Sequence, residues 1–197
     1  AEFDLATQRF KTLLQGNVDA IYFNEKLYIG KREEVFVYNE STGNFDLFYH
    51  LAGKNITLSC LHLDKNKNLW MGTTSNGIYC LSEDKSLSRP VTKGNITSIY
   101  EDSSNELWIG SWEEGLYRVK TDGNIENLRH NPMNTNSLCS NFVRSCCEDN
   151  SGDLWIGTFN GLNRYDRETG KFHLYTANGN SPDGLTHSSI WCIVKDG

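Results

Sequence analysis

Short apolar stretches alternate along the chain with clusters of glycine, asparagine and aspartate. In residues 96–101 two sets of side chains alternate, and their bulky members are β-branched or aromatic, as is typical of strands. None of the repeats described below holds ten glycine-free residues with the periodicity of an amphipathic helix. The pattern therefore predicts an all-β chain of short strands joined by tight turns.

The chain also repeats itself. Four segments related to Leu-Trp-Ile-Gly begin at Leu27, Leu69, Leu107 and Leu154, at spacings of 42, 38 and 47 residues. In each of the last three an aspartate stands six residues before the tryptophan, whereas the first copy has Tyr22 there. Four strands of about five residues with turns of similar length account for a period near 40. Four-stranded antiparallel units in tandem predict a β-propeller.

We expect four complete blades and parts of flanking blades. The expected strands of the complete blades are about 18–22, 26–30, 34–38 and 44–48; 57–62, 68–72, 77–81 and 86–91; 96–101, 106–110, 115–119 and 124–128; and 142–147, 153–157, 161–165 and 171–175. The blades thus span about 18–48, 57–91, 96–128 and 142–175, within one propeller segment covering 1–197. Residues 1–14 are expected to supply the end of one strand and a second strand near 9–14, with a short helix over 7–14 as the weaker alternative. Residues 190–197 are expected to open a further blade with a strand over about 190–195, so the chain would stop in the middle of a repeat.

Two residue types recur in one register of the repeat. The tryptophans stand next to a glycine where strands crowd together, and we expect them to pack between neighbouring blades. The aspartates are expected to brace the turn between the first two strands as Asx-type acceptors. Residues 64–75 begin like a calcium loop, but Leu69 replaces the required glycine and Ser75 the bidentate glutamate. The residues concerned are Trp70, Trp108 and Trp155, with Asp64, Asp102 and Asp149.

Residues 153–166 read Asp-Leu-Trp-Ile-Gly-Thr-Phe-Asn-Gly-Leu-Asn-Arg-Tyr-Asp, and this pattern resembles the two-component regulator propeller repeat. The linker 131–138 is also similar to the loop between blades of that family. The resemblance covers nearly the whole chain and is weakest in the first copy, where Tyr28 replaces tryptophan. It implies the periplasmic sensor region of a hybrid two-component system histidine kinase/response regulator of the kind found in Bacteroides-type gut bacteria.

The resemblance also implies partners. It makes the chain a segment truncated from a larger sensor domain, in the extracytoplasmic part of an inner-membrane receptor. The implied partners are an oligosaccharide ligand, the remaining blades and sensor domain of the same receptor, and a second receptor copy in a homodimer. Two alternatives stay open: a structural or dimerisation scaffold without direct ligand contact, and a propeller lyase or glycosidase.

Composition narrows the partners further. The 19 Lys and Arg against 25 Asp and Glu give a net charge of −6, which argues against nucleic acid or an anionic membrane surface as the main partner. No apolar run approaches the roughly 20 residues that span a bilayer. The start of the chain, residues 1–4, shows neither a basic n-region nor an apolar h-region, so no signal peptide is expected. The expectation is a soluble, single-domain piece.

No sequence motif indicates a catalytic or metal-binding site. The five histidines are scattered, and neither a nucleophile elbow nor a glycine-rich phosphate loop occurs. No two cysteines form a C-x-x-C pair, and adjacent Cys146 and Cys147 point to opposite sides of a strand. We expect the six cysteines to be buried as small apolar side chains, while one disulfide remains open in an oxidising compartment. We expect no enzyme activity, no metal and no cofactor.

The candidate binding residues lie on the variable loops of one face or near its rim. In an antiparallel meander the loops between blades and the second-to-third-strand hairpins share one face of the propeller. That face carries the long loops 128–141 and 179–188, and variable loops on a rigid scaffold are the usual carriers of recognition. An exposed tryptophan beside Glu113 and Glu114 would suit stacking on a sugar ring. The predicted ligand-binding residues are Trp112, Phe159, Arg144, His187 and Trp191.

Overall fold

The computed structural model describes most of the chain. The described residues are 2–4, 9–11, 18, 20–24, 26–52, 56–88, 91–177 and 184–195. Within them the regular secondary structure consists of strands, as the alternating pattern predicted. The same residues contain no helix long and apolar enough to cross a membrane.

The strands form four antiparallel sheets and one hairpin. The first sheet is β3 (Ala20–Asn24), β4 (Lys26–Lys31), β5 (Glu34–Asn39) and β6 (Asn44–His50). The second is β7 (Leu58–Leu63), β8 (Leu69–Thr73) and β9 (Ile78–Leu81). The third is β10 (Ile96–Glu101), β11 (Leu107–Ser111), β12 (Leu116–Val119) and β13 (Ile125–Leu128). The fourth is β14 (Val143–Glu148), β15 (Leu154–Thr158), β16 (Gly161–Asp166) and β17 (Lys171–Tyr175), and the hairpin joins β1 (Glu2–Asp4) to β2 (Arg9–Lys11).

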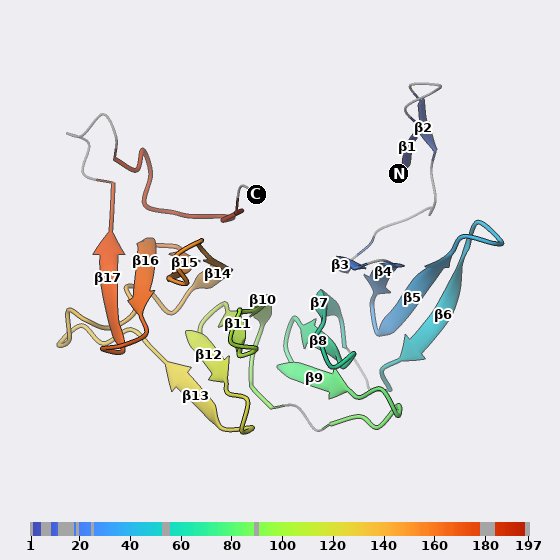
Figure 1. Cartoon of the computed structure of the whole chain (residues 1–197), viewed down its shortest axis with the longest axis horizontal. Helices are drawn as coiled ribbons and strands as arrows, with labels where there is room; N and C mark the ends of the chain where they lie inside the picture. Colours follow the sequence, from blue (N-terminus) through green and yellow to red (C-terminus); the bar gives the residue numbers. More distant parts are fainter. Residues whose placement is uncertain are drawn as a thin grey trace.

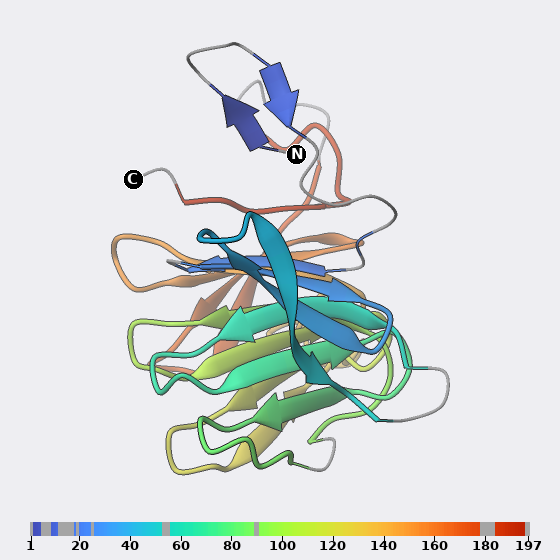
Figure 2. The same ribbon diagram turned by 90° about the vertical axis from the view of Figure 1, so that its right-hand side faces the viewer.

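The four sheets are arranged radially as blades along an arc. Their first strands, β3, β7, β10 and β14, lie on the inner side of the arc, and each contacts the next (Figure 1). The last strands β6, β13 and β17 lie on the outer side. Figure 2 shows neighbouring sheets layered face against face. This radial order of small antiparallel sheets is the β-propeller arrangement that the repeat predicted.

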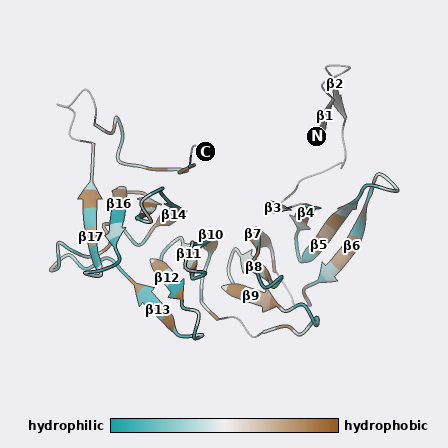
Figure 3. Ribbon diagram, viewed as in Figure 1, coloured by the Kyte–Doolittle hydropathy of each residue, from teal (hydrophilic) through white to brown (hydrophobic). Residues whose placement is uncertain are grey.

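The hydrophobic core lies between blades rather than within one. Three clusters fill the three successive interfaces, with Met71 and Leu58 in the first, Ile96 in the second and Val143 in the third. Successive side chains of a strand face opposite ways, so Leu69 and Met71 pack toward the first blade while Trp70 packs toward the third. Figure 3 accordingly places most hydrophobic residues on strands and most hydrophilic ones on turns.

In the second, third and fourth blades a tryptophan–aspartate pair holds the first turn, and the aspartate braces that turn as predicted. The indole nitrogens of Trp70, Trp108 and Trp155 donate to the aspartates six residues earlier at 2.9, 2.7 and 2.7 Å. The other carboxylate oxygen accepts a backbone N–H four residues after the aspartate, at 2.8 to 3.0 Å. Trp108 is completely buried between two blades.

Ion pairs connect the Trp108–Asp102 pair of the third blade to the fourth blade. Arg167 donates to Asp102 at 2.8 Å and contacts Glu148 at 3.2 Å, and Glu148 also accepts from the backbone of Ser103 at 2.7 Å. Burial raises the pKa of Asp102, but hydrogen bonds from Trp108 and the backbone, with the nearby Arg167 guanidinium, outweigh it and hold that pKa below its usual value.

This depressed pKa predicts a pH-dependent contribution to stability. The ionised Asp102 stabilises the fold above its unfolded pKa of 3.8, and the stabilisation is lost as the pH falls through the lower folded pKa. We expect Asp102→Asn to lower the free energy of unfolding at neutral pH by about 2 kcal/mol. Urea unfolding at neutral pH and near pH 3 measures the difference. The deficit should shrink at the acidic pH, and an equal deficit at both values would contradict the assignment.

Two expected strands are not formed. The strand predicted over 86–91 is reduced to a bridge between Leu81 and Leu87, because the Ser88 hydroxyl, rather than a backbone carbonyl, accepts the Cys80 N–H at 2.9 Å. Residues 89 and 90 of that prediction lie outside the described part. The strand predicted over 190–195 is absent because a strand needs a ladder partner and this segment has none among the described residues.

The beginning of the chain agrees with the strand prediction where it is described. β1 pairs antiparallel with β2, so the alternative of a helix through 9–11 is wrong. Residues 12–14 of the predicted strand lie outside the described residues.

The six cysteines are free thiols, and their burial varies. Cys146 and Cys147 are buried, Cys60, Cys80 and Cys139 are partly buried, and Cys192 is exposed, which corrects the expectation of uniform burial. Burial raises the pKa of both Cys60 and Cys146 to about 12, because an apolar surrounding disfavours the thiolate.

Candidate functional site

A β-bulge directs Arg144 out of the first strand of the fourth blade. Val143 pairs with Thr158 and Ser145 with Gly157, so Arg144 is the extra residue on β14. A bulged residue leaves the regular alternation, and its side chain can be aimed away from the pleat. The two preceding blades have the same bulge, with Ser59 and Thr97 as the extra residues.

The Arg144 guanidinium is surrounded by aromatic rings. Its central carbon lies 3.4 Å from the ring centroid of Trp191, 5.3 Å from that of Trp112 and 5.6 Å from that of Phe159. Phe142 completes the group, with its ring centroid 5.5 Å from Trp112 and 6.2 Å from Phe159. Rings within about 6 Å of a guanidinium attract its charge.

The hairpins at one edge of the blades position two of these rings. Trp112 and Phe159 each follow the second strand of their blade, where they start the turn toward the third strand. The Trp112 N–H donates to the carbonyl of Asn95 at 2.9 Å, and the Phe159 N–H to that of Phe142 at 3.0 Å. These bonds extend the strand pairing and hold both rings beside the bulge.

An open cleft of about 260 Å³ lies against this cluster. We call it the Arg144 cleft. Three blades and the segment 184–195 contribute to it, through Ser59, Asn95, Ile96, Thr97, Trp112, Arg144 and Trp191.

One of the two acidic side chains of the Trp112 hairpin, that of Glu114, is paired with an arginine other than Arg144. Glu114 forms an ion pair with Arg129, and Arg129 also donates to the carbonyl of Glu113 at 3.2 Å. Arg144 has no ion pair with any carboxylate of the described residues. The cleft therefore carries positive charge and aromatic surface.

The structure brings four of the five predicted binding residues together. Trp112, Phe159, Arg144 and Trp191 share the cluster, while His187 does not line the cleft and its ring nitrogen accepts the Ser189 N–H at 2.9 Å. Phe142 was missed by the sequence prediction. Its signal was an aromatic residue just before the first strand, where the other blades have Thr57 and Asn95.

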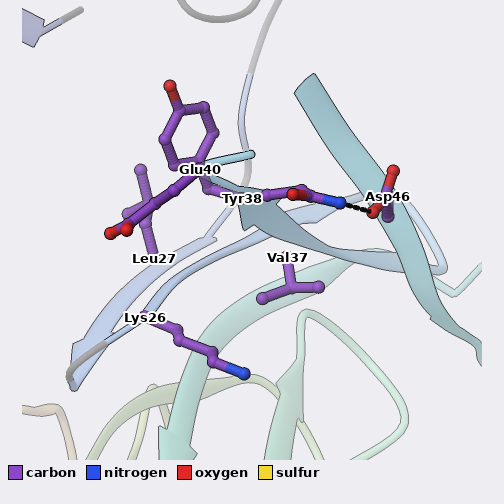
Figure 4. A pocket seen from close by; sticks show the side chains of 7 residues that line it. Lys26, Leu27, Val37, Tyr38, Glu40 and Asp46 are labelled. Atoms are coloured by element: carbon purple, nitrogen blue, oxygen red, sulfur yellow. Dashed lines mark hydrogen bonds between the residues drawn. The ribbon is translucent and has the colours of Figure 1, made fainter. Parts of the chain in front are cut away.

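A second hollow lies at the opposite edge of the blades. It has a volume of about 530 Å³ and is lined by the ends of β4, β5 and β6 in the first blade (Figure 4). The side-chain amide of Asn39 donates a hydrogen bond to the Asp46 carboxylate there at 2.7 Å. Lys26 and Tyr38 also line this hollow. Because this edge carries the short turns and no cluster of stacked rings, we do not assign the site to it.

The described blades define the protein as a β-propeller with an aromatic, cationic cleft on its loop face. Residues 50–75, 90–113 and 137–160 match the two-component regulator propeller. Three separate segments, together less than half of the chain, thus match this repeat. They correspond to the second, third and fourth blades, which carry the tryptophan motif.

Solved structures share this fold. The extracellular domain of a protein classed as a hybrid two-component system from Bacteroides thetaiotaomicron matches with a TM-score of 0.57 at 22% identity, over 98% of this chain and 32% of that one. A second such domain from the same organism matches with a TM-score of 0.54 at 18% identity, over 93% of this chain and 32% of that one. Virginiamycin B lyase from Staphylococcus aureus matches with a TM-score of 0.62 at 17% identity, over 80% and 55%.

These likenesses establish the fold alone, because all three identities are low. The chain spans about half of the lyase and a third of each extracellular domain. No curated protein matches the chain in sequence.

Proposed function

We propose that this chain is a ligand-sensing part of the periplasmic region of a hybrid two-component receptor, anchored in the inner membrane, and that it binds oligosaccharides at the Arg144 cleft. The three segments that match the regulator-propeller repeat support the assignment to such a receptor. The observation that carries the binding role is that Trp112 and Trp191 line one cleft of the loop face together with Arg144, whose guanidinium also lies near Phe159.

The chemistry of the cleft suits a sugar. The apolar C–H face of a pyranose ring packs on an aromatic face, and Trp112 and Trp191 are both exposed for such a contact. The Asn95 side chain lines the same cleft and makes no hydrogen bond among the described residues, so its amide is free for ring hydroxyls. Aromatic surface with a few polar groups is the usual composition of a small-ligand site.

Binding would act on the receptor by shifting populations. The cleft joins three blades to the segment 184–195, so a ligand that contacts Trp191 and Trp112 together favours one placement of that segment. We propose that this bias reaches the rest of the sensor and a second receptor copy in a homodimer, and that the protein works by binding and not by chemistry.

The test is a glycan array with the full chain, followed by calorimetric titration of each binder. We expect at least one oligosaccharide to bind, and Trp112→Ala to weaken it about tenfold, equal to about 1.4 kcal/mol. Ile125→Ala provides the control, because Ile125 is an exposed apolar residue at the opposite edge of the third blade. Binding that is absent throughout, or equal in both variants, would contradict the proposal and favour a scaffold.

A further inference from the structure

Arg144 occupies a position that serves blade packing in the two preceding blades. At the same bulge, the Ser59 hydroxyl donates to the carbonyl of Ile96 in the next blade at 2.5 Å, and the Thr97 hydroxyl donates to that of Val143 at 2.6 Å. Arg144 makes no such bond to the segment that follows the fourth blade. The arginine therefore replaces a structural hydroxyl without taking over its role.

The guanidinium has donors that the described residues leave unsatisfied. Its Nε and Nη1 atoms are both buried and have no hydrogen-bond partner. Aromatic faces attract the positive charge but offer no oxygen acceptor in the plane of the guanidinium. A buried donor without an acceptor is costly, and more so when it is charged, so an acceptor from a ligand would be strongly favoured.

The described part of the chain supplies no anion for this arginine. In the Trp112 hairpin Glu114 is held by Arg129, and the neighbouring Glu113 contacts Arg129 only through its backbone carbonyl. Neither carboxylate forms an ion pair with Arg144 among the described residues. The guanidinium presents its donors in a planar fork, which matches the paired oxygens of a carboxylate or a sulfate.

We infer that the ligand of the Arg144 cleft is an acidic saccharide, whose carboxylate or sulfate ester pairs with the Arg144 guanidinium while its ring stacks on Trp112. This inference rests on the proposed function and narrows it. Trp191 covers one face of the guanidinium: its ring centroid lies 3.4 Å from the central carbon, and the side chain is 74% exposed. Within the described residues Arg144 is its one ring contact, so little holds the indole in place if a bound anion requires it to shift.

The experiment compares matched saccharides on the full chain by calorimetry. The probes are trigalacturonate, its fully methyl-esterified form and 6-O-sulfated galactotriose, which separate a carboxylate, a neutral ring and a sulfate. We expect one of the two anionic probes to bind about tenfold more tightly than the neutral one. Raising NaCl from about 50 to about 500 mM should weaken the anionic probe and leave the neutral one unchanged.

Variants test whether the preference for the anionic probe arises from Arg144. Arg144→Gln should reduce the preference for the anionic probe to about one, and Arg144→Lys should restore only part of it, because an ammonium lacks the planar fork. Lys67→Gln removes the same charge at an exposed site in the second blade and should keep the preference. Unfolding midpoints verify that each variant is folded.

The outcomes separate the two proposals. If acidic and neutral probes bind with equal affinity and Trp112→Ala weakens both, the acidic-ligand inference is overturned and saccharide sensing stays in place. An array that finds only neutral binders would do the same. An array without any binder would overturn both, and a preference that survives Arg144→Gln would remove this residue from the site.

Discussion

Replacing Trp108 with alanine is expected to lower the free energy of unfolding by about 4 kcal/mol. The side chain is 0% exposed, it fills the interface between the third and fourth blades, and its ring lies 5.3 Å from that of Tyr165. Its removal leaves a cavity between two rigid sheets and also leaves Asp102 without its indole donor. Urea unfolding followed by circular dichroism measures the loss.

Trp155→Ala is the matched control for this prediction. Trp155 makes the same hydrogen bond to its aspartate at 2.7 Å, but it is only partly buried. Its loss should therefore be about half that of Trp108. Met133→Ala, at a side chain that is 92% exposed, should have almost no effect. Equal losses at Trp108 and Trp155 would show that the hydrogen bond, and not packing between blades, dominates.

Gly77→Ala is expected to cost about 3 kcal/mol or more. Gly77 has a φ of +75°, and an added Cβ would lie 2.0 Å from the carbonyl oxygen of Thr92. That oxygen belongs to the backbone, so the clash can be relieved only by moving a strand connection. The unfolding free energy of the variant in urea measures the cost.

Gly123→Ala isolates the conformational part of this effect. Gly123 has a φ of +84°, but an added Cβ there meets nothing within 4 Å. Only the strain of a left-handed alanine remains, which is about 1 kcal/mol. If both variants lose the same stability, the close approach of Thr92 to Gly77 does not matter in solution.

The packing of Trp108 between blades and the close backbone contact at Gly77 explain why the candidate site can lie on loops. Buried tryptophans and close backbone contacts fix the blades against one another, so the hairpins that carry Trp112 and Phe159 start from rigid strands. Recognition loops need such a scaffold, because disorder in the loop would have to be removed on binding.

Much of the candidate site could be predicted from the sequence, but its geometry could not. Trp112 and Phe159 stand out as aromatic residues on expected hairpins, and Arg144 and Trp191 stand near the starts of expected strands at the same rim. Their meeting depends on the bulge at Arg144 and on the path of 184–195, which no local pattern encodes. His187 satisfied the same sequence criterion, yet it bonds within its own loop.

The sequence by itself determined the period, most of the strands and the recurring tryptophan and aspartate positions, because each of these depends on residues close together in the chain and recurs in several copies. Tertiary structure alone decided which blade loses its fourth strand and which side chains enclose the cleft. Those outcomes depend on competition between distant groups, such as the Ser88 hydroxyl against a backbone carbonyl, or three rings from separate segments around one guanidinium.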